Sequence, residues 1–199
     1  MPWANGKPMR YYFGVMVKSV LLIHAVALLL VAAPTQKPNS KEYLTPDEIT
    51  KIQDSQEIDL RTKLYLQAGA LRLKVAEERL RGKESDPGEP LEFFSVEDML
   101  DGYHQIVRSV MINLDDAYQK PSQDRAMVVK ALKNLKDSTG KAIEDLEILE
   151  KIAEEKRLEE IWNLAHQALD IARGAHEGAE LGLSRQPSGE SKPKRKKPS

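Results

Sequence analysis

Few residues in this chain have types and spacings that could support chemistry, and the clearest group is Glu97, Asp101 and His104. On a helix these positions share one face. Di-metal sites in helical bundles use two acid-x-x-His pairs together with carboxylates from two other helices. The chain supplies only one such pair, formed by Asp101 and His104. A metal site at these three residues is therefore an alternative hypothesis, and an acidic, solvent-exposed helix face is the simpler interpretation.

Two further histidines lie four positions before an acidic residue. His166 precedes Asp170, and His176 precedes Glu180. Such pairs stabilise the exposed face of a helix by a few tenths of a kcal/mol. We interpret both as surface contacts.

The sequence lacks the common catalytic motifs. It contains no Cys, which excludes disulfides, thiol nucleophiles and thiolate metal sites. It also contains no Gly-x-Ser-x-Gly elbow, no phosphate-binding loop and no Gly-x-Gly-x-x-Gly motif. We therefore expect a protein that is not an enzyme and that needs no cofactor.

The C-terminal tail carries a cluster of basic residues. Its members are Lys192, Lys194, Arg195, Lys196 and Lys197. Each positive charge near an anionic surface contributes about 1 kcal/mol of binding free energy, which salt reduces. The tail could thus adhere to an anionic envelope polymer or lipid, or it could act only as a solubilising, disordered extension. No aromatic residues are interleaved with the charges, so we do not expect nucleic acid as a partner.

The first 33 residues are typical of an export signal. They contain three basic residues and no acidic one, and residues 19–33 are almost entirely apolar before a small-residue end at Ala32 and Ala33. This pattern predicts a secretory signal peptide, with an uncleaved membrane anchor as the alternative. The cleavage point is left open, as is the true start, which is either Met1 or Met9. We accordingly expect an exported protein, periplasmic or extracellular.

Length and composition fit one helical domain after this segment. The chain has 199 residues, of which 41% are hydrophobic and 31% charged, with a formal net charge of −1. Removing residues 1–33 takes away three positive charges and leaves a net charge of −4. The remaining chain combines an acidic body with a basic tail.

Four stretches show the three- and four-residue apolar spacing of amphipathic helices. We predict helices at 46–81, 96–119, 123–153 and 158–183, after a linker at 34–44 and before a disordered tail at 184–199. The first stretch could be one helix or a short helix followed by a longer one that restarts near Ser55. A tight turn near residues 153–157 is expected to separate the last two helices.

The last predicted helix has an unusual surface of small residues. Alanines follow one face, and Gly174, Gly178 and Gly182 recur at intervals of four. The glycines could mark a fraying helix end, or they could allow close contact with a partner helix.

These observations predict an all-α antiparallel bundle of about four amphipathic helices. The expected function is that of an exported, non-enzymatic binding or scaffold module of the cell envelope. Its partner would be an unidentified protein or a second copy of the chain, bound through the helices.

Overall fold

The computed structural model describes residues 42–120 and 124–185. These residues belong to the second of two compact units, Lys41–Ser199. The predicted signal at 1–33, most of the linker and the five basic tail residues lie outside the described ranges. The expectations about export and tail adhesion therefore stay predictions.

The described residues form five helices and no strand. The helices are α2 (Pro46–Asp54), α3 (Ile58–Leu80), α4 (Val96–Gln119), α5 (Arg125–Glu155) and α6 (Glu159–Ser184). The prediction of an all-α helical bundle is thus confirmed for this part of the chain. Of the two alternatives for residues 46–81, the structure has the short helix followed by the longer one.

Two helices begin with reciprocal side-chain caps. The Thr45 hydroxyl accepts a hydrogen bond from the Glu48 amide, and Glu48 accepts one from the Thr45 amide. Ser95 and Asp98 form the same arrangement at the start of α4. Such caps satisfy amides that have no partner within the helix.

The turns after α3 and α5 share one hydrogen-bond pattern. After α3, Gly82 has φ +88°, and its amide donates to the Arg79 carbonyl. After α5, Arg157 has φ +58°, and its amide donates to the Glu154 carbonyl. A position with positive φ directly after a helix normally favours glycine. The turn after α5 therefore has an arginine where glycine would fit better.

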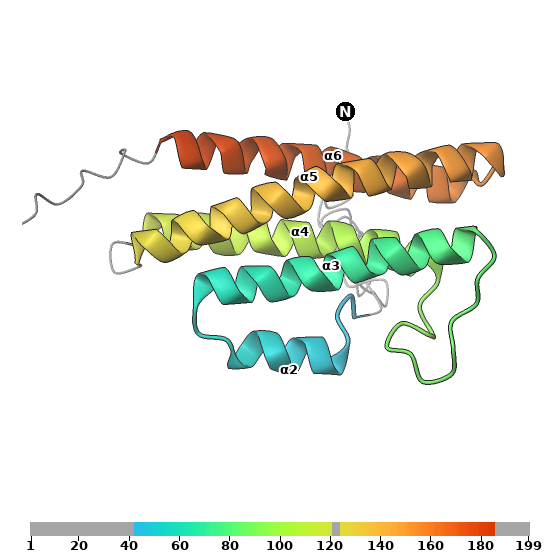
Figure 1. The fold of residues 1–199 in the computed structure, drawn as a ribbon, viewed down its shortest axis with the longest axis horizontal. Helices are drawn as coiled ribbons and strands as arrows, with labels where there is room; N and C mark the ends of the chain where they lie inside the picture. The colour runs from blue at the N-terminus through green and yellow to red at the C-terminus, as the bar shows by residue number, and fades with distance from the viewer. Residues whose placement is uncertain (1–41, 121–123, 186–199) are drawn as a thin grey trace, which may run out of the picture. The chain divides into compact units, whose positions relative to one another are not determined.

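The four long helices form two antiparallel pairs, α3 with α4 and α5 with α6 (Figure 1). Helix α3 packs against α4 and α5, and α6 packs against α5 and α4. Consecutive helices run in opposite directions, as predicted, but α3 and α5 run in the same direction, as do α4 and α6 (Figure 1). These parallel neighbours arise because the connection from α4 to α5 crosses between diagonal positions, an arrangement that the apolar spacing does not specify.

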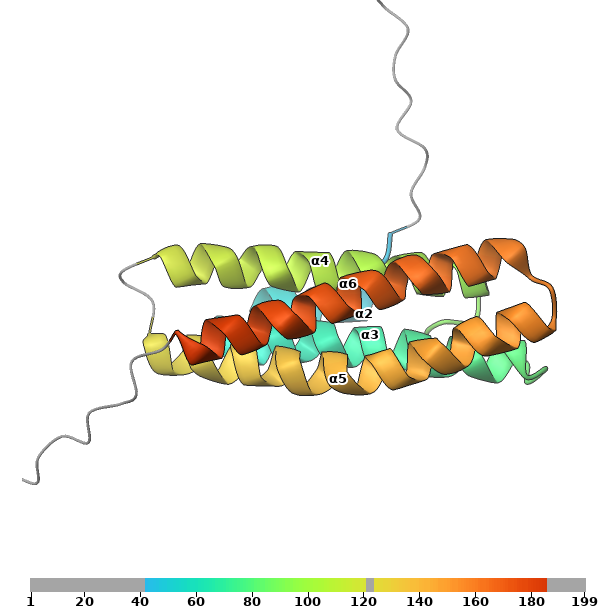
Figure 2. The ribbon, with the colours of Figure 1, turned by 90° about the horizontal axis from the view of Figure 1, so that it is seen from above.

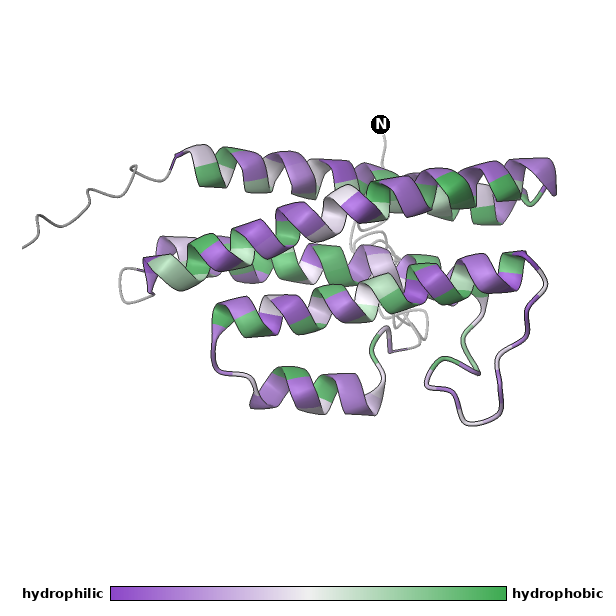
Figure 3. Cartoon of the chain, in the orientation of Figure 1, coloured by the Kyte–Doolittle hydropathy of each residue, from purple (hydrophilic) through white to green (hydrophobic). Residues whose placement is uncertain are grey.

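The core lies between these four helices, and α2 covers the outside of α3. Figure 3 shows hydrophobic and hydrophilic residues sharing each helix, as expected for helices that bury one face. The α6 face toward the core is formed mainly by alanines: Ala165, Ala168, Ala172, Ala175 and Ala179 are all buried. None of the described helices is both long enough and apolar enough to cross a membrane.

Candidate functional site

The small side chains of α6 help to form an apolar cavity in the bundle. At Gly182, an added Cβ atom would lie only 3.1 Å from a methyl group of Leu132 on α5, so the two helices approach closely there. Figure 2 shows α6 crossing over α5 and moving away from α4 toward its C-terminal end. The seam between α4 and α6 consequently opens near the ends of both helices.

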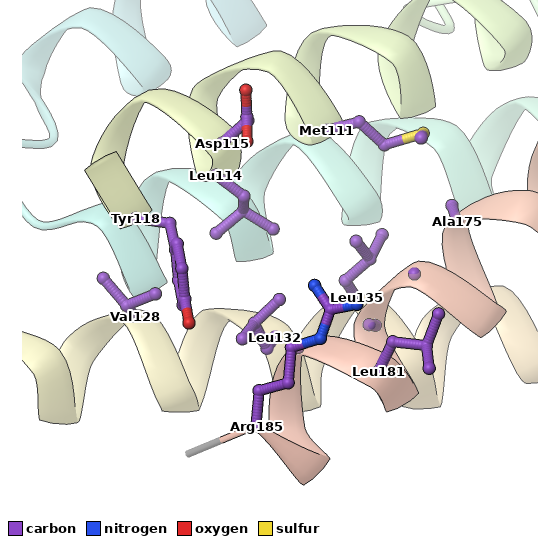
Figure 4. Close-up of a pocket in the computed structure, with 13 residues that line it drawn as sticks. Met111, Leu114, Asp115, Tyr118, Val128, Leu132, Leu135, Ala175, Leu181 and Arg185 are labelled. Carbon is purple, nitrogen blue, oxygen red and sulfur yellow. The ribbon is translucent and has the colours of Figure 1, made fainter.

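A cavity of about 310 Å³ occupies this seam (Figure 4). Helices α4 and α6 supply its walls, and α5 supplies its floor. Its lining residues are Met111, Leu114, Asp115, Tyr118, Val128, Leu132, Leu135, Ala175, Gly178, Ala179, Leu181, Gly182 and Arg185. We call this cavity and its rim the α4–α6 groove.

The groove is apolar inside, and its apolar surface continues onto the rim. Leu114, Val128 and Leu135 are buried at its base. By contrast, Met111 and Tyr118 are each 38% exposed and Leu181 is 55% exposed. Large apolar side chains that cluster around an open hollow are typical of an interaction surface.

Two charged side chains also line the groove, and that of Arg185 reaches in beside Leu132 and Leu135 (Figure 4). Asp115 is on the α4 side and Arg185 is at the end of α6 (Figure 4). Neither forms an ion pair with any residue in the ranges 42–120 and 124–185; Asp115 accepts a hydrogen bond from the Gln119 side chain. Arg125 lies nearby, with its guanidinium carbon 5.0 Å from the centre of the Tyr118 ring.

Glycine keeps part of the groove empty. An added Cβ at Gly178, which lines the cavity, would meet no atom within 4 Å. Gly174 lies one helical turn earlier and has the same free space, but it does not line the cavity. A side chain at Gly178 would therefore begin in open space at the edge of the groove.

The predicted metal residues are not brought together with further ligands. Asp101 is exposed and His104 is half-buried on α4. Within the described ranges, no group of three or more His, Asp or Glu side chains is placed to hold a metal ion. The metal hypothesis thus gains no support from the geometry.

The two histidines of α6, His166 and His176, contact α5 as well as their own helix. His166 Nδ1 lies 2.7 Å from Glu150 Oε1, in addition to a longer contact with Asp170. His176 Nδ1 donates a hydrogen bond of 3.0 Å to the Lys136 carbonyl. Sequence spacing could indicate only the contacts within one helix, because a partner on α5 depends on how the two helices pack.

A buried ion pair holds α2 against α3, away from the groove. The Arg72 side chain is completely buried and donates to both carboxylate oxygens of Glu48, at 2.9 and 2.8 Å. Burial alone would raise the pKa of Glu48, but the bonds from Arg72 and Thr45 outweigh it and lower this pKa below its ordinary value. Because the Arg72 guanidinium and the Glu48 carboxylate bind each other, we assign this pair a structural role.

The groove was missed when the sequence was considered alone. The alanine and glycine face of α6 was visible, but a hollow depends on the path of α6 relative to α4. The available signal was the presence of Met111, Tyr118 and Leu181 beside the expected core stripes. Large apolar residues at such positions are candidates for a second, exposed surface.

The fold and groove define a helical bundle with an open apolar seam. No protein-family model, curated protein or solved structure matched the chain in the comparisons made.

Proposed function

We propose that this protein is an exported, non-enzymatic binding module of the cell envelope, and that its α4–α6 groove holds an amphipathic helix of a partner protein. The observation that carries the proposal is the 310 Å³ apolar groove with exposed Met111, Tyr118 and Leu181 on its rim. The predicted export signal at residues 1–33 is the reason for placing the module in the envelope.

The size of the groove suits side chains that anchor a helix. A cavity of roughly 150 Å³ holds one benzene ring, so this groove has room for about two ring-sized groups. Amphipathic helices present such anchors at intervals of three, four and seven residues. Two anchors one turn apart lie about 5–6 Å from each other, which fits a hollow that follows a helix seam.

The exposed rim favours a macromolecule over a small ligand. Small molecules are usually held in sites that bury about 70–90% of their surface. Here the apolar surface extends outside the hollow onto both helices, where a compact ligand would leave it exposed. A helix lying along the seam would cover both the hollow and the rim.

Peptide binding to two matched variants tests the proposal. The probe is a fluorescent peptide of about 20 residues, long enough to form a stable helix, with leucines along one face and neutral polar residues elsewhere. Gly178→Leu should fill the groove and weaken binding at least about tenfold, a loss of roughly 1.4 kcal/mol. Gly174→Leu makes the same change outside the groove and should leave the affinity unchanged.

Fluorescence anisotropy would measure both affinities, and thermal unfolding would verify that both variants fold. Failure of the peptide to bind saturably to the original chain would contradict the proposal. Equal weakening by the two substitutions would also contradict it, since binding would then not depend on the groove.

A further inference from the structure

We infer that the partner helix carries an acidic residue between its apolar anchors, and that the carboxylate of this residue pairs with Arg185 inside the α4–α6 groove. This inference rests on the proposed function, because it specifies the chemistry of the occupant of the same groove. It follows from the position of one arginine side chain and from the charges around it.

Arg185 places a positive charge within an apolar hollow. Its side chain reaches in from the end of α6 beside Leu132 and Leu135 of α5 (Figure 4). Both leucines are buried, and their side chains offer the guanidinium group no hydrogen-bond acceptor. Within the ranges 42–120 and 124–185, the Arg185 side chain forms neither an ion pair nor a hydrogen bond.

A helix bound in the groove would remove water from this guanidinium group. Arg185 is exposed in the free chain, so water solvates its charge there. A partner that covered the groove without an acidic group would leave the charge poorly compensated beside the leucines, which lowers affinity. A carboxylate compensates the charge and can accept two parallel hydrogen bonds from the guanidinium group.

The other charges around the groove also favour a negatively charged occupant. Arg125 lies against the Tyr118 ring, with its guanidinium carbon 5.0 Å from the ring centre. Among the lining residues that the structure describes, Asp115 alone is acidic, and its carboxylate accepts a hydrogen bond from the Gln119 side chain. Two arginines therefore lie at the groove with one carboxylate, and a partner with a negative charge complements this balance.

The place of Arg185 determines where the partner needs its acidic residue. Arg185 follows Leu181 of the groove rim by one helical turn, and residues four apart share one helix face. A partner helix whose leucines contact the rim would meet Arg185 with the same face. The acidic residue therefore belongs within the apolar stripe, about one turn from an anchor.

Two peptides that differ in one side chain test the inference. Both have about 20 residues, a leucine stripe and neutral polar residues elsewhere, with either glutamate or glutamine within the stripe, one turn from the middle leucine. Glutamate and glutamine have similar helix propensities, so the main difference is the charge. The original chain should bind the glutamate peptide about three- to fivefold more tightly, and high salt should reduce this preference.

Matched variants on α6 identify the cation. Arg185→Gln should abolish the preference, because it removes the charge from the groove. Arg173→Gln makes the same change at an exposed position outside the groove, where Arg173 pairs with Glu147, and it should keep the preference. Arg185→Lys retains the charge without the paired donors and should keep part of the preference. Calorimetric titration would give the affinities, and thermal unfolding would verify that each variant folds.

The outcomes separate the two proposals. Equal affinities of both peptides for the original chain would overturn the inferred pairing but would keep the groove as a helix-binding site. A glutamate preference that survives Arg185→Gln, or that Arg173→Gln abolishes as well, would also overturn the pairing. Absence of saturable binding by either peptide to the original chain would contradict the proposed function and the inference with it.

Discussion

At the scale of single residues, one ion pair holds α2 against α3, and capping side chains fix the starts of α2 and α4. Arg72 is the clearest case, because it is fully buried and its charge is compensated by Glu48. Glu48 at the same time caps α2 through the Thr45 amide. One carboxylate thus supports both the start of α2 and its attachment to α3.

Removing Glu48 should therefore be costly. Glu48→Ala leaves the Arg72 charge buried without a partner, which typically costs about 3–5 kcal/mol of unfolding free energy. Asp47→Ala removes an exposed acidic residue from the same helical turn and should cost far less. Urea unfolding followed by circular dichroism would compare the two variants, and similar losses would show that the ion pair is unimportant for stability.

The same pair predicts a dependence of stability on pH. The pKa of Glu48 in the folded chain lies below its ordinary value of 4.5, so ionised Glu48 stabilises the fold above that value. This contribution should disappear as the pH falls through the lower, folded-state pKa. Glu48→Gln should accordingly lose less stability than the original chain between about pH 7 and pH 3, as measured by urea unfolding. An identical pH dependence in the two proteins would refute this assignment.

At the scale of the helices, the sequence predicts where most elements begin and end. Thr45 and Ser95 with their acidic partners indicate the starts of α2 and α4, because capping depends on residues three positions apart. The break before α3 could not be decided, since the apolar stripe weakens there without a Gly or Pro. Likewise, the interruption of the apolar spacing near residues 153–157 predicted a turn. It did not identify Arg157 as the residue with positive φ.

That residue gives a second stability prediction. Arg157 has φ +58°, a conformation that costs a side-chain-bearing residue about 1–2 kcal/mol. Arg157→Gly should raise the unfolding free energy by about 0.5–1 kcal/mol, because relief of this cost exceeds the added flexibility of the unfolded chain.

Lys156→Gly provides the matched control for this turn. Lys156 has φ −88°, so glycine relieves no strain there and should lower stability. Thermal unfolding of both variants would measure the effects, and destabilisation by Arg157→Gly would contradict the assigned role of the turn.

The arrangement of the whole bundle could be predicted only in part. The apolar stripes predict several helices around one core, but they do not specify which helices become lateral neighbours. The parallel contact of α4 with α6 and the opening between them depend on the diagonal connection and on the close approach at Gly182 and Leu132. The groove is therefore a consequence of tertiary packing, although the small residues that permit it can be seen in the sequence.

The proposed function also belongs to this scale, because no single residue of the groove would bind a partner alone. Leu181 and Ile148 provide a matched comparison, since they are 55% and 41% exposed. Leu181 is on the groove rim, whereas Ile148 is on α5 and does not line the groove. A partner bound in the groove should therefore contact Leu181 and should not contact Ile148.

The most direct measurement is photo-cross-linking in cells that produce the protein, with a photoreactive amino acid at Leu181 or at Ile148 and the cross-linked peptides mapped by mass spectrometry. We predict that position 181 joins to an amphipathic helical segment of another envelope protein and that position 148 does not. Equal cross-linking from both positions, or cross-links from position 181 only to a second copy of this chain, would contradict the account.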